Sequence, residues 1–309
     1  MAITVHPVSP EFVAEIGDVD LSRPLAAADL AAIKQAFWKY AVLVFPDQIL
    51  TDDQHLAFAA CFGPLETSIG VYRTDVVPRA RPELSDISNI DHEGRIWGER
   101  SRIRRYKQGN RLWHTDSSFK HVPARCSLLY ARAVPPLGGH THFADARAAY
   151  DALPSALRDR LAGLVAEHSI FNSRARIGFD DWVEAERENL EVVPQALVRT
   201  IPESGRRTLY VAAHAGRIYG MDEAEGRALV DRLLAHATQP QFVHIHRWRA
   251  HDLVMWDDRC TLHRGSEYDD LRWRRDMLRA TVSDELNTCE REGIELPARA
   301  VRVAPLSRP

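Results

Sequence analysis

Two histidines and one aspartate in this sequence have the residue types and spacing needed to hold a metal ion. His114 and Asp116 are two residues apart in LWHTDSSF, and side chains at positions i and i+2 of a strand point to the same face. His263 follows far downstream in HDLVMWDDRCTLHRG, at the end of a predicted strand. Two histidines and a carboxylate form the facial triad typical of non-haem Fe(II) oxygenases. Its three free coordination positions suit a chelating 2-oxo acid and O2.

The HxD pair is weak evidence by itself, because the chain has 14 histidines and the pair can arise by chance. A hydrogen-bonded core histidine is an equally good interpretation of His114 alone. The segment RWRRDMLR adds a second signal, since Arg275 and Arg279 are four residues apart and would share one face of a strand. The alternative is a solvated basic strand. An arginine fork matches a carboxylate and stays charged when partly buried, so together with the triad we favour a site for acids.

The composition argues against several classes of protein. A net charge of -3 gives no support for binding nucleic acid, although a local basic pocket for a small anion stays possible. The four cysteines are far apart in sequence, so neither a zinc knuckle nor a disulfide framework is expected. No segment resembles a signal peptide or is long and apolar enough for a bilayer. We therefore expect a soluble, cytoplasmic protein with no membrane partner.

The sequence predicts one domain over residues 1–286 and a loosely held tail over 287–309. Helices are predicted over residues 27–39, 52–62, 148–168 and 222–238. Thr51 is placed to cap the second of them, and Pro154 should break the third into two pieces. The basic stretch 100–108, RSRIRRYKQ, is expected to be a solvated loop, or alternatively to attract an acidic substrate.

Short strands alternate with these helices. They are predicted at residues 41–46, 83–90, 127–134, 140–145, 208–214, 242–248, 252–257 and 275–282. Many short strands with helices before and between them predict a mostly β fold with added helices, built on a double-stranded β-helix (jelly-roll) core. The long polar stretch from Thr67 to Gly109 is expected to be mostly irregular and is a candidate lid.

Several of these motifs, in this order, resemble the taurine/2,4-dichlorophenoxyacetate dioxygenase family. They are LWHTDSSF, VPPLGGHTHFADARAAYDALP, HDLVMWDDRCTLHRG and RRDMLRAT, and the resemblance runs over about residues 5–285. It is strongest to the aryloxyacetate branch, in DISN, AEHSIFNSR and LVRT. Ordered motifs over most of the chain are much harder to obtain by chance than one HxD pair. The resemblance implies an Fe(II)- and 2-oxoglutarate-dependent dioxygenase.

The resemblance also assigns roles to positions that match the family's motifs. His114, Asp116 and His263 match the iron ligands. Four residues match the family's 2-oxoglutarate site. Thr141 would hydrogen-bond 2-oxoglutarate, and Arg275 would pair with its distal carboxylate. Arg279 would lie near both the co-substrate and the acidic group of the substrate, and Trp256 would lie on the oxygen-binding side of the iron. One position departs from the pattern: related sequences commonly have asparagine where this chain has Asp258, which would change a hydrogen bond next to the ligands.

Residues that would contact the primary substrate are less well defined by the sequence. The candidates are Arg73, Ser88, Asn89, Arg95, His214 and Arg279. For each, surface exposure or ordinary hydrogen bonding is at least as good an interpretation. The aryloxyacetate branch carries lysines in this region, whereas this chain reads Ile69-Gly70-Val71-Tyr72-Arg73, so the anion contact there is expected to be shifted or lost.

The predicted function is hydroxylation of a C–H bond of a small organic acid. An aryloxyalkanoate is the expected class, and its hydroxylated ether would collapse to a phenol and an oxo acid. A taurine-type sulfonate dioxygenase, and a desaturating or cyclising member of the same class, are the alternatives. A non-catalytic metal-binding jelly roll and a zinc hydrolase are further rivals, but the hydrolase gives no role to Thr141, Arg275 and Arg279 together. Self-association into a homo-oligomer is expected from the resemblance.

Overall fold

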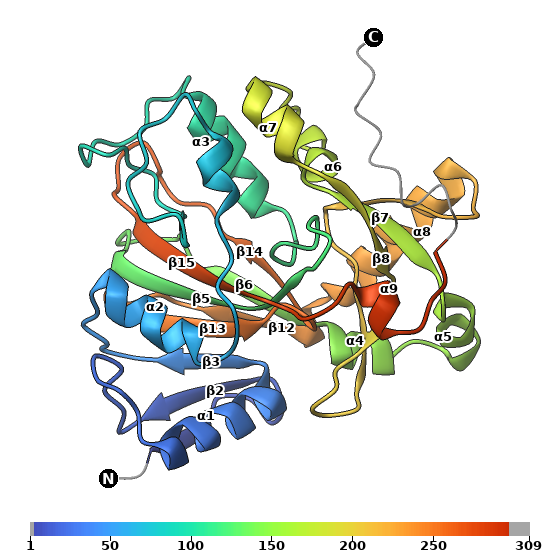
Figure 1. The fold of residues 1–309 in the computed structure, drawn as a ribbon, viewed down its shortest axis with the longest axis horizontal. Coiled ribbons are helices and arrows are strands. Elements are labelled where there is room, and N and C mark those ends of the chain that lie inside the picture. Colours follow the sequence, from blue (N-terminus) through green and yellow to red (C-terminus); the bar gives the residue numbers. More distant parts are fainter. Residues whose placement is uncertain (1–2, 297–309) are drawn as a thin grey trace.

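The computed structural model describes residues 3–296, and a seven-stranded sheet forms its centre (Figure 1). In spatial order its strands are β1 (Thr4–Pro7), β2 (Val13–Gly17), β3 (Val42–Phe45), β13 (Leu253–Asp257), β5 (Ala124–Ala133), β15 (Asp276–Ser283) and β4 (Leu84–Asp86). All neighbours are antiparallel except β2 and β3. A second antiparallel sheet has the order β12 (Val243–His246), β6 (Thr141–Asp145) and β14 (Thr261–Gly265).

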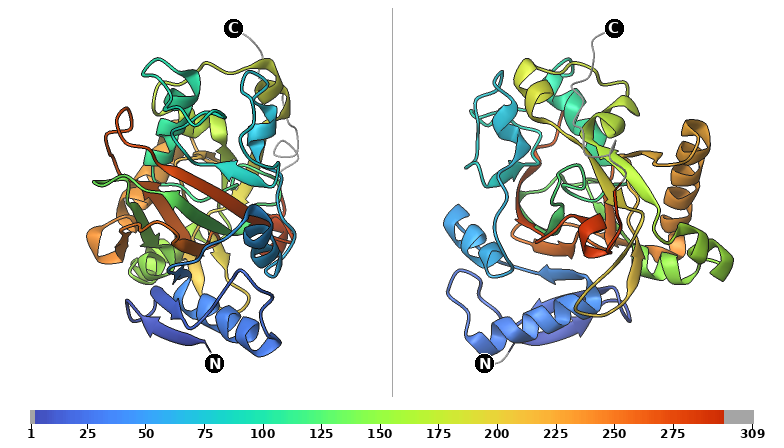
Figure 2. Two further views of the ribbon diagram at one scale, coloured as in Figure 1. Left: turned by 90° about the vertical axis from the view of Figure 1, so that its left-hand side faces the viewer. Right: turned by 45° about the vertical axis from the view of Figure 1, so that its right-hand side comes forward.

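Two smaller sheets and the helices surround these layers (Figure 2). The small sheets are β11 (Ala215–Ile218), β7 (Val165–Ser169) and β8 (Val192–Ala196), and β10 (Arg207–Leu209) with β9 (Val198–Thr200). The helices are α1 (Ala27–Tyr40), α2 (Asp52–Ala60), α3 (Arg102–Lys107), α4 (Ala146–Asp151), α5 (Ser155–Leu161), α6 (Ile170–Ala175), α7 (Glu184–Asn189), α8 (Glu223–Ala237) and α9 (Thr288–Arg291). Short 3-10 turns lie at Ile69–Tyr72, Gln108–Arg111 and Pro240–Phe242.

The two faces of the large sheet have different partners, because successive side chains of a strand alternate between faces. Leu43 and Phe45 of β3 point outward and pack with Phe37 of α1 and Phe58 of α2 in one buried cluster. Val42 and Val44 point inward, into a second cluster that includes Phe143 of β6. The inward faces of the two sheets therefore enclose the interior of a jelly roll, and the predicted fold class is confirmed.

Most predicted elements are present with shifted ends. Thr51 caps α2 through a capping box with Gln54, and the break at Pro154 separates α4 from α5. The helix predicted over 148–168 is wrong at its end, because Val165–Ser169 forms strand β7, buried between β11 and β8. The strand predicted at 208–214 is regular only to Leu209. Here tertiary pairing overrides local propensity.

The stretch from Thr67 to Gly109 contains more structure than predicted. Strand β4 and helix α3 lie within it, and α3 replaces the solvated loop expected at 100–108. The reason is that Ile103 and Tyr106, three apart, are buried, while basic side chains of the same helix have carboxylate partners. Arg102 pairs with Glu186 at 2.9 Å and Arg104 pairs with Asp270 at 2.8 Å.

The predicted loose tail also differs from the structure where the structure describes it. Helix α9 packs on the body, since Cys289 is fully buried with Val165 and Ala196. Residues 297–309 of the predicted tail lie outside the described residues. The division into a domain over 1–286 and a tail stays a prediction. Among the described residues, no helix has both the length and the apolar character needed to cross a bilayer.

His168, on β7, gives the fold a dependence on pH. Its ring is fully buried and stacked on Tyr210, neither ring nitrogen has a hydrogen-bond partner in the described structure, and burial lowers its pKa to about 3. The unfolded chain takes up a proton below about pH 6.5, so the free energy of unfolding should fall as the pH drops from 6.5 towards 3.

We expect His168→Phe, which keeps the ring stack, to remove part of this dependence. At pH 5 the wild type should lose about 2 kcal/mol more unfolding free energy, relative to pH 7, than the variant. Urea titrations of both proteins at the two pH values measure the difference. Equal losses in the two proteins would exclude His168 as the source.

Candidate metal and co-substrate site

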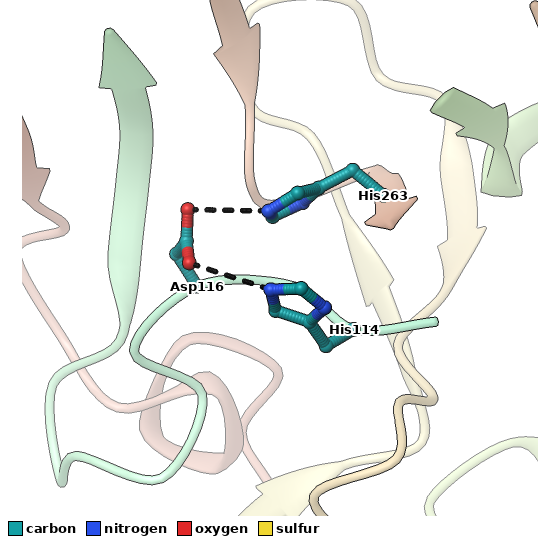
Figure 3. Close-up of side chains that lie close together, drawn as sticks. All are labelled: His114, Asp116 and His263. Atoms are coloured by element: carbon teal, nitrogen blue, oxygen red, sulfur yellow. Dashed lines mark ion pairs between the residues drawn. The ribbon is translucent and has the colours of Figure 1, made fainter. Parts of the chain in front are cut away.

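His114, Asp116 and His263 meet at one buried point inside the jelly roll (Figure 3). The Nε2 atom of His114 lies 3.9 Å from Oδ1 of Asp116, and Nε2 of His263 lies 3.6 Å from Oδ2. His114 is not in a regular strand but forms one bridge to His263, in the middle of β14, through backbone N–H donations of 3.0 and 2.7 Å. The prediction that His263 follows a strand end is thus corrected: a separate strand carries it.

The protonation of these side chains fits a divalent metal ion. The Nδ1–H of His114 donates to the carbonyl of Leu112 at 2.7 Å, which leaves the Nε2 lone pair directed into the site. Burial lowers the pKa of both His114 and His263 and favours the neutral imidazole that binds metals. Burial opposes ionisation of Asp116, but the charge of Arg279 and the histidines hold its pKa below the usual value. Two imidazoles and one carboxylate suit Fe(II).

The Asp116 carboxylate is oriented by neighbours from two strands of the large sheet. Ser127 of β5 donates its hydroxyl to Oδ2 at 2.8 Å, and Arg279 of β15 forms an ion pair with Oδ1. Both residues are on the inward faces of their strands. The metal ligand set is therefore supported by the sheet interior rather than by loops alone.

Asp258 is the position where the sequence departs from the family's pattern. Its Oδ1 accepts the indole N–H of Trp256 at 2.9 Å and the backbone N–H of Asp116 at 3.0 Å, whereas the buried Oδ2 has no partner in the described structure. Burial and the negative charge of Asp116 raise the pKa of Asp258 well above its usual range. A neutral side chain with one accepting oxygen satisfies both donors.

We expect Asp258→Asn to fold at least as stably as the wild type, because asparagine keeps the accepting oxygen and removes the buried acid. Asp258→Leu is the comparison variant that should be destabilised. It leaves the Trp256 and Asp116 N–H groups without an acceptor, at a cost of about 1–3 kcal/mol each. Urea unfolding at pH 7.5 measures both. If Asp258→Asn were as unstable as Asp258→Leu, an ionised Asp258 would have to be the native form.

A cavity of about 100 Å³ adjoins one side of the metal ligands. It is lined by His114 and His263 and by all the residues predicted to bind the co-substrate, namely Thr141, Trp256, Arg275 and Arg279. The Trp256 ring lies 4.7 Å from the His263 ring, and the Thr141 hydroxyl accepts the indole N–H of Trp248 at 2.9 Å. Residues distant in sequence thus converge on one small chamber.

Arg275 is the charged group of this chamber. It is only 7% exposed, its Nη1 donates to the carbonyl of Ile87 at 3.2 Å, and no carboxylate of the described residues pairs with it. Burial lowers its pKa. A buried guanidinium without an acidic partner is unfavourable unless a ligand supplies the negative charge.

A larger cavity, of about 240 Å³, adjoins the smaller one and shares His114 and Arg279 with it. Two of the predicted substrate residues, Arg73 and His214, line it, as does Arg279. Apolar side chains of Phe119 and Ile170 form part of its surface. The sequence interpretation missed one further lining residue, Arg174, although it lies in the quoted segment AEHSIFNSR, four residues after Ile170.

The other predicted substrate residues lie elsewhere. Arg95 lines neither cavity, because its exposed side chain pairs with Asp91 at 2.9 Å. Ser88 and Asn89 border the smaller cavity, not the larger one. The Asn89 side-chain oxygen accepts the backbone N–H of Arg275 at 2.8 Å, so Asn89 positions the arginine. Arg95 thus forms an exposed ion pair, Ser88 and Asn89 border the smaller cavity, and their assignment as substrate contacts stays a prediction.

Comparison with known proteins assigns the fold and the site to a family. The family model "Taurine catabolism dioxygenase TauD, TfdA family" matches residues 4–281. The chain belongs to this family. An alpha-ketoglutarate-dependent 2,4-dichlorophenoxyacetate dioxygenase of Cupriavidus pinatubonensis is 45% identical over 92% of this chain and 99% of that protein. As a TauD, TfdA family member, the chain is an enzyme of the 2-oxoglutarate-dependent dioxygenase class, as predicted.

Two further relatives of this TauD, TfdA family member are informative. An (S)-phenoxypropionate/alpha-ketoglutarate-dioxygenase of Sphingobium herbicidovorans is 36% identical over 87% of this chain and 91% of that protein. The crystal structure of AAD-2 in complex with Mn(II) and N-oxalylglycine superimposes with a TM-score of 0.84 at 43% identity, covering 93% of this chain and 99% of that one. The similarity supports a metal and 2-oxoglutarate as the ligands of the site.

Proposed function

We propose that this enzyme is an Fe(II)- and 2-oxoglutarate-dependent dioxygenase that hydroxylates aryloxyalkanoates next to the ether oxygen, so that the product collapses to a phenol and an oxo acid. The observation that supports this most directly is the buried His114–Asp116–His263 set with two adjoining cavities beside it, both lined by His114. One cavity fits a small dicarboxylate, and the other fits a larger molecule with an acidic group.

The residues of the chain would bind the metal and the co-substrate, orient the substrate and keep water out of the site. His114, Asp116 and His263 would hold Fe(II), which with 2-oxoglutarate and O2 supplies the oxidising power for hydroxylation and yields succinate and CO2. Arg275 would pair with the distal carboxylate of 2-oxoglutarate in the smaller cavity. Trp256 and Phe143 would keep water away from the other side of His263.

An aryloxyalkanoate fits the larger cavity because an aryl group needs an apolar surface and its acid needs a cation. Phe119, Ile170 and Ile69 line part of this cavity, with arginines nearby. A short sulfonate would leave the apolar surface uncovered. The names of the relatives given above support the same substrate class. A cytoplasmic location and self-association are part of the proposal, and cell fractionation and the mass in solution would test them.

The test starts anaerobically. Fe(II) and 2-oxoglutarate are added to the purified enzyme, and the weak visible charge-transfer band of the chelate is recorded. Then 2,4-dichlorophenoxyacetate, a phenoxypropionate, taurine and other small acids are added singly, followed by O2, and succinate and phenol are measured. Phenol formed in step with succinate would support the proposal. If taurine alone were turned over, the substrate class would be a sulfonate instead of an aryloxyalkanoate. If the band were absent, the assignment of the 2-oxoglutarate site would be wrong.

A further inference from the structure

The buried arginines of this enzyme fall into two groups. Arg147, Arg199 and Arg259 each form an ion pair with an aspartate, at 2.9, 2.6 and 2.8 Å. Arg174 and Arg275, 4% and 7% exposed, have no carboxylate within 4.0 Å among the described residues. Each of these two lines one of the two cavities beside the metal ligands, Arg275 the smaller and Arg174 the larger. A missing counter-ion at each cavity indicates that a ligand supplies it.

The groups that contact Arg174 are polar side chains and an aromatic ring, and no carboxylate of the described residues forms an ion pair with it. Its Nη1 donates to the Ser173 hydroxyl at 3.1 Å, its Nη2 donates to Asn110 Oδ1 at 3.3 Å, and the guanidinium lies 4.3 Å from the centre of the Tyr106 ring. The buried Nε has no partner in the described structure. The Gly109 backbone packs so closely that a Cβ there would lie 2.3 Å from Nη1, which fixes the guanidinium in place.

The other cations of the larger cavity already have acidic partners. Seven arginines and lysines line it, and the six besides Arg174 pair with carboxylates: Arg73 with Glu186, Arg79 with Asp276, Arg81 with Asp53, Lys107 with Asp86, Lys120 with Glu66 and Arg279 with Asp116. Binding a substrate acid to any of these six would mean sharing or breaking an existing pair. Arg174 forms no such ion pair among the described residues.

The position of Arg174 also suits the reaction. It shares the inner face of α6 with Ile170, four residues earlier, and both line the cavity next to His114 and His214. An acid held at Arg174 would place the adjacent carbon near the ligands and the aryl group over Ile170 and Phe119.

We infer that Arg174 binds the acid group of the primary substrate, in place of the sequence-predicted Arg73, Arg95 and Arg279. This inference rests on the proposed function, because it concerns the substrate of the same site. It restricts the substrate to molecules whose anion is separated from an apolar group by a short linker. Arg174 and Arg275 then divide the two acids of the reaction between two chambers.

The test measures binding rather than turnover alone. Anaerobic enzyme loaded with Fe(II) and 2-oxoglutarate is titrated with 2,4-dichlorophenoxyacetate and other small acids, and with the neutral analogue 2-(2,4-dichlorophenoxy)ethanol, by calorimetry. Arg174→Ala should raise the Kd for the acid by about 10- to 100-fold, the value of a charged hydrogen-bonded pair. The Kd for the alcohol and for 2-oxoglutarate should change less than about threefold, and added guanidinium ion should restore acid binding.

Arg176→Ala is the matched control, because Arg176 directly follows the same helix but pairs with Asp231 at 2.9 Å and lines neither cavity. Both variants should show the same far-ultraviolet circular dichroism, and Arg174→Lys provides a second variant that keeps the charge without the fork. The assignment would be overturned if Arg174→Ala weakened the binding of acid and alcohol equally, or weakened neither. It would also be overturned if the wild type did not bind the acid more tightly than the alcohol. Acid binding through Arg174 without phenol formation would instead count against the proposed reaction alone.

Discussion

Asp116→Ala is expected to abolish metal-dependent turnover while leaving a folded protein. The carboxylate is the only anionic member of the His114–Asp116–His263 set, and both histidine Nε2 atoms face its oxygens. Loss of groups that merely support metal ligands costs about 10- to 100-fold in affinity, so loss of a ligand should exceed about 100-fold. Fe(II) or Mn(II) binding by equilibrium dialysis and succinate formation measure the two effects.

Asp252→Ala provides the control for this experiment. Asp252 is also fully buried beside a histidine, with Oδ2 3.2 Å from His246 Nε2, but it lines neither cavity. Its removal should lower stability without changing the affinity for the metal. Full activity of Asp116→Ala would refute the assignment of the three metal ligands. Loss of the metal in Asp252→Ala as well would show that removing any buried aspartate beside a histidine has this effect, so that the loss would not be specific to Asp116.

Arg275→Gln is expected to raise the KM for 2-oxoglutarate by about 10- to 100-fold, because a charged hydrogen bond to its distal carboxylate is lost. The KM for the primary substrate should change less than about threefold, since Arg275 lines only the smaller cavity. Initial rates of succinate formation, with each substrate varied in turn, separate the two constants.

The neighbouring Arg274→Gln is the matched control. The Arg274 side chain is 53% exposed and pairs with Asp276 at 3.0 Å, so its loss removes the same charge from the same segment without touching a cavity. It should leave both KM values unchanged. Equal increases in the two KM values for Arg275→Gln would contradict its assignment to the co-substrate.

Local patterns in the sequence were sufficient for much of the fold. Strands such as β3 and β13 are recognisable as short apolar runs that are buried on both faces, and the caps at Thr51 and Asp222 follow from local backbone N–H groups. Strand β7 was misassigned as the end of a helix because its burial comes from β8 and β11, which are distant in sequence. Propensity carries no information about such partners.

For the candidate site, too, some features could be predicted from the sequence and others became clear only from the structure. The sequence by itself predicted the metal ligands and the arginine of the co-substrate, because His114 and Asp116 two apart, His263, and Arg275 lie in ordered motifs, and the structure brings the three predicted ligands together. Only the tertiary structure decided which cation is available to the primary substrate. Arg73, Arg95 and Arg279 have carboxylate partners, whereas Arg174 has none within residues 3–296. Ion pairing depends on contacts between distant segments, and a list of basic residues cannot reveal which charge is left uncompensated.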